Sequence, residues 1–309
     1  MIKINNIIKS YKNGKETVPA LRGVSFSVKE GELFGLIGPD GAGKTSLLRI
    51  LTTLLLPDSG TAILKGFDTV KDYKSIRQIT GYMPGKFSLY QDLSVEENLG
   101  FFATIFKTTI KENYHLIKDI YEQIEPFKNR KAGKLSGGMK QKLALSCALI
   151  HKPAILLLDE PTTGVDVVSR KEFWQMLQRL KAQGLTILVA TPYMDEAVLC
   201  DRVALMQDGR ILDIDTPARL IEKNAHNMLA VKSPDMYNLL LTLRKSAAVD
   251  TAYLFGEYYH VTLKDSATST FDLNQWLETQ GQKQVEIKNI RPGIEDIFMN
   301  LMQTHTHAN

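Results

Sequence analysis

The chain has 309 residues, of which 44% are hydrophobic and 23% are charged. This length corresponds to about two domains of roughly 150 residues each, and the composition excludes a disordered chain, a collagen and a low-complexity scaffold. The 38 basic and 34 acidic side chains give a net charge of +4, which is too small to indicate nucleic-acid binding by itself.

Cysteine content and hydrophobicity indicate the compartment. The two cysteines, Cys147 and Cys200, exclude a disulfide-rich scaffold and have no metal-binding spacing, as is usual in a reducing compartment. No segment approaches the ~18 apolar residues that cross a bilayer. The first residues also lack the basic start and apolar run of a signal peptide. We therefore expect a cytosolic chain that can still dock on a membrane component.

The first 56 residues predict a strand–strand–strand–helix order. Apolar positions at 2–8 begin the first strand, and those at 24–28 alternate with polar ones in the second, with the turn Asn13-Gly14-Lys15 between them. The apolar run 33–37 predicts a buried strand. A helix is expected over 46–56, ended by a proline.

The loop between this buried strand and the helix matches the phosphate-binding pattern G-x-x-x-x-G-K-[ST]. Glycines let backbone N–H groups turn toward phosphate oxygens, and the start of the following helix attracts the same anion. Lys44 would reach the β- and γ-phosphates, and the Thr45 hydroxyl would ligate Mg²⁺. The predicted nucleotide-binding residues of this segment are Gly38, Pro39, Asp40, Gly41, Ala42, Gly43, Lys44, Thr45 and Ser46.

A second nucleotide-binding feature is the apolar run 155–158, which is followed by Asp159 and Glu160. An unpaired acid at the end of a buried strand is costly, and bound Mg²⁺ would relieve that cost at Asp159. Glu160 would then orient or deprotonate an attacking water. If this pair is considered without the phosphate loop, an alternative to the magnesium-binding role is that the acid at the strand end caps a helix. A predicted helix at 169–183 and a strand at 187–189 complete a β–α–β unit.

Between these two features, Leu135-Ser136-Gly137-Gly138 opens another helical run. The three motifs in this order resemble the ATP-binding subunit of ABC transporters over residues 1 to about 220, most closely the cassettes of ABC-2-type exporters, including multidrug exporters. The resemblance implies that Ser136, Gly137 and Gly138 bind ATP held by the phosphate loop of a dimer partner. It also implies that Tyr11 stacks on adenine and that Asp166 lies in the loop coupling the two sites.

Two departures from the family's pattern matter most. Gly85 stands where the family usually has a Gln that touches Mg²⁺ and the attacking water, and Pro192 stands where a His usually contacts the γ-phosphate. Three explanations remain open. Hydrolysis is slow and the chain pairs with an orthodox cassette, or a subfamily tolerates both changes, or neighbours substitute. The candidate substitutes are Lys86, Thr191 and Tyr193. Because losing one positioning donor costs about 10²–10³ in rate in other enzymes, slow hydrolysis is favoured.

The resemblance also implies the domain organisation and the partners. We expect an α/β P-loop ATPase domain at 1–223 with a helical subdomain at about 88–150, in which Ser94 and Glu97 predict a capping box. In the family, a groove of this subdomain takes a short cytoplasmic helix of a membrane-spanning permease subunit. Phe87 and Tyr90 are the predicted contacts with that partner.

Residues 224–309 have no Gly-rich loop and predict a small α+β domain, with an order like a split β–α–β unit. Segment 291–298 resembles the tails of the same exporter group, and regulation and dimer contact are two hypotheses for its role. The predicted elements are strand 228–232, helix 235–245, strands 249–255 and 258–263, helix 270–279, strand 284–289 and helix 293–302.

We therefore predict an ATPase subunit that dimerises over ATP, with itself or another cassette, and energises an exporter from the inner face of the cell membrane. ATP and Mg²⁺ are the expected cofactors, Lys44 and Glu160 the catalytic residues, Thr45 and Asp159 the metal ligands, and no nucleic-acid partner is expected. One alternative is a degenerate subunit that binds ATP as a dimer clamp. Another is a soluble ABC ATPase of translation or repair, which fits less well because the chain has one cassette and no long heptad run.

Overall fold

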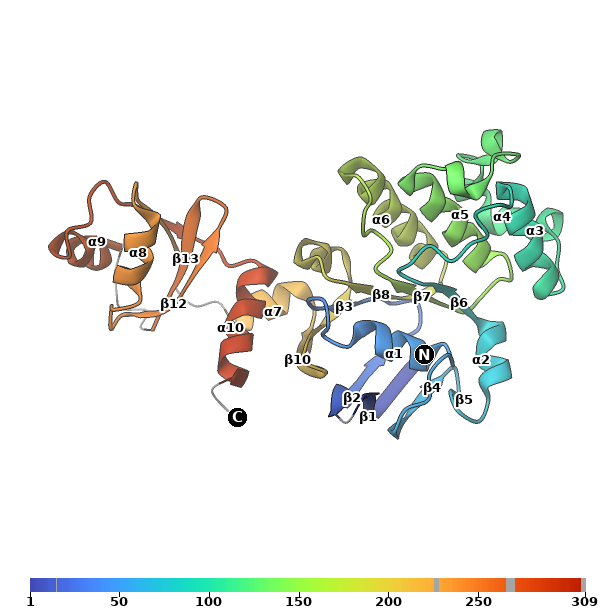
Figure 1. Ribbon diagram of the computed structural model, residues 1–309, viewed down its shortest axis with the longest axis horizontal. Helices are drawn as coiled ribbons and strands as arrows, with labels where there is room; N and C mark the ends of the chain where they lie inside the picture. The colour runs from blue at the N-terminus through green and yellow to red at the C-terminus, as the bar shows by residue number, and fades with distance from the viewer. Residues whose placement is uncertain (15, 225–227, 265–269, 307–309) are drawn as a thin grey trace. The chain divides into compact units, whose positions relative to one another are not determined.

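The structure is a computed structural model that describes residues 1–14, 16–224, 228–264 and 270–306 (Figure 1). The chain divides into two compact units, Met1–Thr216 and Pro217–Asn309. The division follows Thr216 rather than the predicted residue 223, because helix α7 (Pro217–Lys223) packs against α10 (Ile294–Thr306) within the second unit.

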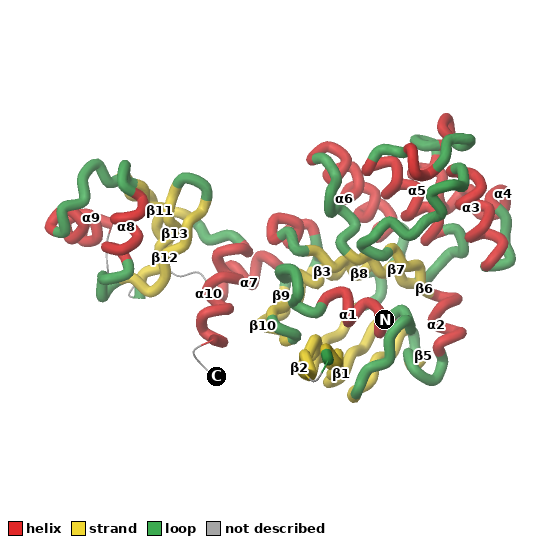
Figure 2. Tube along the Cα trace, in the orientation of Figure 1, coloured by secondary structure: helices red, strands yellow, loops and turns green. Residues whose placement is uncertain are grey.

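Two sheets frame the first unit (Figure 2). The strands of the larger sheet are β3 (Leu33–Ile37), β6 (Thr80–Met83), β7 (Ile155–Asp159), β8 (Thr186–Thr191), β9 (Arg202–Gln207) and β10 (Arg210–Asp215). Their order is β10-β9-β3-β8-β7-β6, and every pair is parallel except β10 with β9. The smaller sheet is antiparallel and has the order β2-β1-β4-β5. Its strands are β1 (Ile2–Asn13), β2 (Glu16–Val28), β4 (Ser59–Leu64) and β5 (Phe67–Asp68). The predicted turn between β1 and β2 includes Lys15, which lies outside the described residues.

Helix α1 (Lys44–Leu51) lies between the two sheets and contacts strands of both. Its buried leucines and isoleucine share one hydrophobic core with β1, β2, β3, β7 and β8. The predicted C-terminal end of this helix is wrong. The chain leaves the helix after Leu51 because Thr53 adopts a φ of +62°, and the N–H groups of Leu54 and Leu55 bond back to the carbonyl oxygen of Arg49.

The predicted helical segment after β6 is confirmed as a group of helices at one end of the first unit (Figure 1). The capping box is also confirmed, since the Ser94 hydroxyl accepts from the Glu97 N–H while the Glu97 carboxylate accepts from the Ser94 N–H. The α-helices of the first unit that follow α1 are α2 (Tyr73–Ile79), α3 (Val95–Ile105), α4 (Ile110–Tyr121), α5 (Gly137–Leu149) and α6 (Val167–Ala182).

The sheet order brings three loops together. β3, β8 and β7 are neighbours and run parallel, so their carboxyl ends meet at one edge of the sheet. The phosphate loop follows β3, the acid pair ends β7, and the Pro192 loop follows β8. This is the edge at which open α/β sheets bind their ligands.

The second unit has the predicted β–α–β–β–α–β order. Its elements, besides α7 and α10, are β11 (Met228–Lys232), α8 (Met236–Leu243), β12 (Val249–Phe255), β13 (Tyr258–Leu263), α9 (Thr270–Thr279) and β14 (Glu286–Ile290). The strands form an antiparallel sheet with the order β12-β13-β11-β14. Tyr259 and Val261 of β13 face the core shared with α8 and α9. His260, which points the other way, contacts Asp296 of α10 at 2.7 Å, so α10 covers the opposite face.

Among the described residues, no helix is both long and apolar enough to cross a membrane.

Candidate nucleotide-binding site

The backbone of the phosphate loop depends on its glycines. Gly41 has a φ of +81° and Gly43 a φ of +105°, values that side-chain-bearing residues adopt only with strain. Gly38 lies so close to β9 that a Cβ there would be 2.1 Å from the carbonyl oxygen of Met206. The loop is therefore closely packed on the sheet, as a phosphate-binding loop requires.

Lys44, the first residue of α1, is 3% exposed. Its ammonium donates to the carbonyl oxygens of Gly38 at 2.7 Å and Pro39 at 2.9 Å, and lies 3.7 Å from Glu160. Burial lowers the pKa of Lys44, and the carboxylates of Glu160, Asp40 and Asp159 oppose that shift. A buried cation surrounded by the loop is placed to pair with phosphate oxygens.

Thr45 and Asp159 form the predicted magnesium pair. The Thr45 hydroxyl donates to Asp159 Oδ1 at 3.0 Å, and Asp159 is 2% exposed. Burial raises the pKa of Asp159, while the Thr45 hydrogen bond and the charge of Lys44 lower it. Hydroxyl and carboxylate oxygens suit Mg²⁺. Within the described part of the chain, no three or more His, Cys, Asp or Glu side chains gather to hold a metal. These two ligands therefore fit a Mg²⁺ ion that nucleotide oxygens and water complete.

Glu160 occupies a strained position at the end of β7. Its φ is +49°, which is uncommon for a residue with a side chain and recurs at functional sites. Its N–H donates to the carbonyl oxygen of Ala190 at 2.8 Å, which ties it to β8. The carboxylate lies beside Lys44, and its role as the general base for an attacking water stays a prediction.

Both departures from the family's pattern lie at this edge of the sheet. A Cβ on Gly85 would be 3.1 Å from the carbonyl oxygen of Asp159 and 3.7 Å from Glu160 Cβ, so position 85 borders the acid pair. Pro192 follows Thr191, whose carbonyl oxygen accepts from the Gly38 N–H at 3.3 Å. Both positions therefore lie beside the residues of the predicted nucleotide site, and the roles of the usual Gln and His there stay a prediction.

Two of the three candidate substitutes make contacts within the domain. The Thr191 hydroxyl donates to Glu196 at 2.6 Å and accepts from the Tyr193 N–H at 3.1 Å. The Tyr193 ring lies under the Arg170 guanidinium at 4.2 Å. Of these three side chains, Lys86 is the one that is exposed.

Tyr11 lies next to the phosphate loop. Its ring is 39% exposed at the end of β1, and its hydroxyl is 3.0 Å from that of Ser46 in α1. This location agrees with a ring that lies against a nucleotide base. Stacking on adenine stays a prediction.

The signature residues open α5 beside α6. The Ser136 hydroxyl accepts from the Met139 N–H at 3.3 Å and caps α5. A Cβ on Gly138 would be 2.7 Å from the Ser169 hydroxyl, so this glycine lets the two helix starts approach. Asp166 caps α6 by accepting from the Ser169 N–H at 2.9 Å. The signature and the predicted coupling loop are therefore in direct contact.

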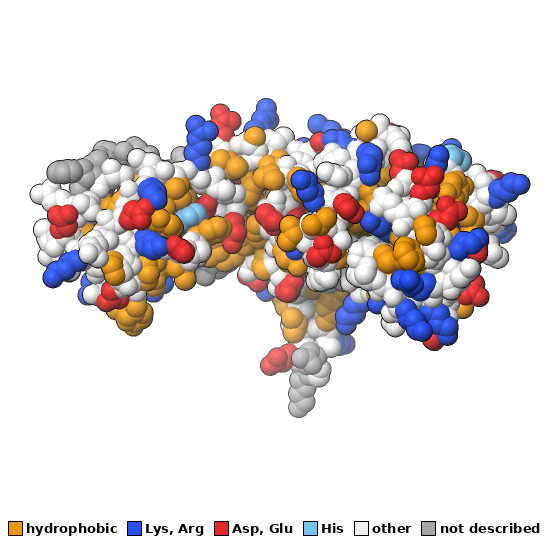
Figure 3. Space-filling view, turned by 90° about the horizontal axis from the view of Figure 1, so that it is seen from above, with side chains coloured by type: hydrophobic (Ala, Val, Ile, Leu, Met, Phe, Trp, Pro, Cys, Tyr) orange, Lys and Arg blue, Asp and Glu red, His pale blue; other side chains and the backbone are white. Residues whose placement is uncertain are grey.

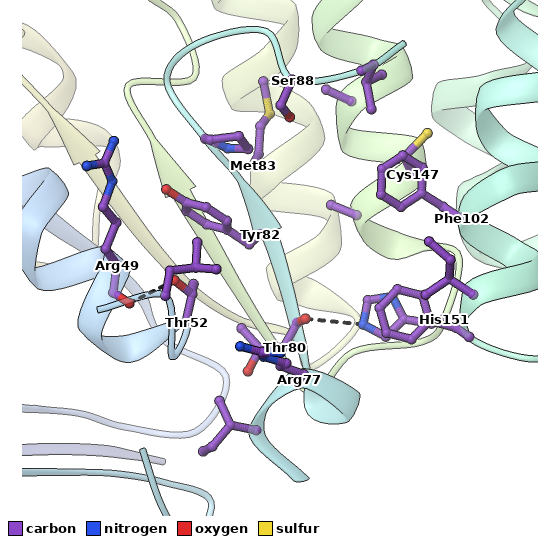
Figure 4. Close-up of a pocket in the computed structure, with 18 residues that line it drawn as sticks. Arg49, Thr52, Arg77, Thr80, Tyr82, Met83, Ser88, Phe102, Cys147 and His151 are labelled. Atoms are coloured by element: carbon purple, nitrogen blue, oxygen red, sulfur yellow. Dashed lines mark hydrogen bonds between the residues drawn. The ribbon is translucent and has the colours of Figure 1, made fainter. Parts of the chain in front are cut away.

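A separate cavity of about 680 Å³ lies between the sheet and the helical group (Figure 4). Its walls are mostly apolar and come from β6, α3 and α5, with Arg49 and Arg77 on the α1 and α2 side. His151 bonds to the Thr80 carbonyl oxygen at 3.2 Å, and its ring stacks on Phe106. Burial lowers the pKa of His151 to about 4, so it is neutral at pH 7.

The cavity lies in the helical region where the partner groove was expected, and that it is this groove stays a prediction. Neither predicted contact lines the cavity. Phe87 lies under the Lys140 ammonium, and Tyr90 meets Phe101 edge to face. The cavity residues Arg49, Arg77 and His151 were missed, because they come from three distant segments and only the fold brings them together.

Comparisons with known proteins agree with this geometry. Residues 21–163 match the family model described as ABC transporter. The probable multidrug ABC transporter ATP-binding protein YbhF of Escherichia coli is 39% identical over 306 residues, which are 98% of this chain and 52% of that protein. This chain thus spans about half the length of YbhF. The Nod factor export ATP-binding protein I of Burkholderia orbicola is 40% identical over 304 residues, with 97% of this chain and 96% of the relative covered.

Among solved structures, the dimeric ATP-binding cassette MJ0796, bound to ADP and Pi, is 30% identical and covers 70% of this chain and 98% of its own, with a TM-score of 0.64. The expected α/β ABC ATPase fold is therefore confirmed, and a C-terminal region extends beyond the matched cassette. From these matches and the clustered phosphate loop and acid pair, we conclude that the chain belongs to the family of ABC transporter ATP-binding proteins.

Proposed function

We propose that this chain hydrolyses ATP and energises an ABC-type exporter through separate membrane-spanning permease subunits. The observation that carries the proposal is the gathering of two pairs at one sheet edge, with Thr45 hydrogen-bonded to Asp159 and Lys44 within ion-pair distance of Glu160. The export role is supported by the two relatives, which are described as multidrug and Nod factor export proteins.

In this proposal, the chain's residues bind ATP, orient its phosphates and deprotonate the attacking water. Lys44 exchanges its loop carbonyl partners for phosphate oxygens of ATP, and Tyr11 stacks on the base. Thr45 and Asp159 would hold Mg²⁺, which would neutralise charge on the phosphate oxygens. Glu160 accepts the proton of the attacking water. Dimerisation brings Ser136, Gly137 and Gly138 onto the nucleotide of the partner cassette, and release after hydrolysis reopens the dimer.

A degenerate, slowly hydrolysing clamp is the second candidate function. It is favoured by Gly85 and Pro192, and by Thr191 and Tyr193, whose side chains make internal contacts. Glu160 at the end of β7 favours hydrolysis instead. The deciding experiment measures Mg²⁺-ATP turnover of the purified chain beside Glu160→Gln. Turnover of about 10 s⁻¹ that is lost in the variant supports the proposal that the chain hydrolyses ATP. Tight ATP binding with negligible turnover supports the clamp.

We further propose that the 680 Å³ cavity takes a short, mostly apolar permease helix with an acidic residue near Arg49 and Arg77, since these two arginines are the only charged residues in its described lining. The chain would then lie on the inner face of the cell membrane. Ile105→Glu, at an exposed lining residue, should reduce recovery with the membrane fraction of the native cells. Val70→Glu, at an exposed residue outside the lining, should not. Equal recovery of the two variants would contradict the docking site.

Nucleic acid is not part of the proposal. On the face shown in Figure 3, basic and acidic side chains are interspersed with apolar ones and form no continuous basic surface.

A further inference from the structure

Glu196 is a buried carboxylate that the mechanism above does not use. It lies in the short helical turn after Pro192 and is 1% exposed. Two threonine hydroxyls donate to it, Thr162 at 2.7 Å and Thr191 at 2.6 Å. Thr162 follows Glu160 by two residues, and Thr191 directly precedes Pro192. One carboxylate therefore ties the loop of the general base to the loop that follows β8.

Arg170 of α6 faces this carboxylate without bonding to it. Its Nε is 3.9 Å from Glu196 Oε1, and its Nη1 is 3.9 Å from Asp195 Oδ2. N–H···O bonds span about 2.7–3.2 Å, so neither contact is a hydrogen bond. The Nε atom is buried and has no hydrogen-bond partner. A buried donor without an acceptor is unfavourable, and the Glu196 carboxylate is close enough for a small displacement to bring it within hydrogen-bond distance.

The same arginine connects these loops to the signature. Its guanidinium covers the ring of Tyr193, the residue after Pro192. The preceding residue in the chain, Ser169, donates its N–H to the carboxylate of Asp166. Ser169 also lies against Gly138 in the first turn of α5. Contacts therefore run without a break from the Pro192 loop through Glu196 and Arg170 to the residues that would serve the partner's ATP.

We propose that Arg170 and Glu196 are a pair of positioning residues that couple the two ATP sites of the dimer. When the cassette closes over ATP, α6 moves by about 1 Å and the Arg170 Nε–H donates to Glu196, a charge-assisted bond that fixes the Pro192 loop to the signature side. The pair gives α6 two discrete positions, which is what coupling between sites requires. The inference rests on the proposed function, because it assumes dimerisation over ATP.

The chain provides a matched control pair on the opposite edge of the same sheet. Arg202, which begins β9, lies 3.2 Å from Glu32, which precedes β3. Arg202 is 24% exposed, like Arg170, and it also covers an aromatic ring, that of Phe34. Breaking this pair disturbs stability in a comparable way and leaves the nucleotide site untouched.

The test measures turnover of the full chain against ATP concentration for Arg170→Met, Glu196→Gln, the double variant and Arg202→Met. We expect each Arg170 or Glu196 variant to lower kcat by about tenfold, with KM changed less than about twofold, and the Hill coefficient to fall toward 1. The double variant should be no worse than either single one, because both remove the same interaction. Arg170→Lys should recover part of the loss, and Arg202→Met should keep the wild-type Hill coefficient.

Two controls separate the failure of this inference from that of the proposed function. Glu196→Gln keeps the size of the side chain, and melting temperatures of all variants identify a merely structural loss. If wild type turns over too slowly to measure, ATP-driven dimerisation of the Glu160→Gln chain, with and without Arg170→Met, replaces turnover. Absence of dimers in Glu160→Gln alone overturns the proposed function and the inference with it. If Arg170→Met leaves turnover, or dimerisation in the Glu160→Gln background, unchanged, the inference is overturned and the proposed function is not.

Discussion

Gly85→Gln places beside the acid pair the amide that the resemblance to the family predicts at this position. The new Cβ would be 3.1 Å from the carbonyl oxygen of Asp159, so that contact must widen by a few tenths of an ångström. Gly85 is not among the glycines with positive φ, so the side chain adds no backbone strain. It also restricts the unfolded chain, which stabilises a protein by about 0.4–1 kcal/mol. Because these effects oppose each other, we expect the unfolding free energy to change by less than about 1 kcal/mol.

The effect on rate should be much larger than the effect on stability. A positioning donor contributes about 10²–10³ to turnover in other enzymes, so with Pro192 still in place we expect kcat to rise by at least about tenfold. The assay is phosphate release at saturating Mg²⁺-ATP, with Gly100→Gln as the control, since a Cβ at that helical glycine of α3 meets no atom within 4 Å. A folded Gly85→Gln chain with unchanged or lower turnover would refute the view that the missing amide limits hydrolysis.

Three further predictions concern single side chains. Asp159→Asn should abolish the Mg²⁺ dependence of ATP binding. Because burial raises the pKa of Asp159 and so disfavours its charge, the variant should also raise the unfolding free energy at pH 7 by about 0.5–2 kcal/mol in urea titrations. Tyr11→Ala should weaken ATP binding about tenfold by calorimetry, whereas Tyr11→Phe, which loses only the contact with Ser46, should stay within about threefold. The pKa of His151 is lowered to about 4, so the unfolded chain binds the proton first as the pH falls. Stability that is complete above about pH 6.5 should therefore drop by about 2 kcal/mol at pH 5, and His151→Gln should flatten that dependence.

The residues of the site could be predicted because they lie in short, contiguous segments of the sequence. The phosphate loop and the acid pair each carry their pattern within eight residues, and the strand–loop–helix context around Lys44 is equally local. The order of elements in the second unit was also predictable from hydrophobic alternation and turn residues. The parallel order of β3, β8 and β7 then brings the segments together without further information.

What the sequence could not provide are contacts between distant segments. Glu196 accepts a hydrogen bond from Thr162, 34 residues away in the sequence. No local sequence pattern distinguishes this buried glutamate from an exposed one. Likewise, the left-handed conformation of Thr53 ends α1 early, although the apolar run continues to Leu56. The hydrophobic pattern shows which residues favour burial. It does not show where one backbone dihedral turns the chain away from the core.

The proposed docking cavity and the acid pair share one structural element. Met83 ends β6, and Met83 and Pro84 line both the 680 Å³ cavity and a smaller cavity of about 180 Å³ that reaches Gly85, Glu160 and the start of α5. A helix seated in the larger cavity would press on the same segment that borders the general base. Gly85 adds no side chain to this segment, and Met83 and Pro84 still pack between the two cavities. If a permease helix seats in the larger cavity as proposed, its displacement would reach the acid pair through the packing of this segment, whatever side chain position 85 carries.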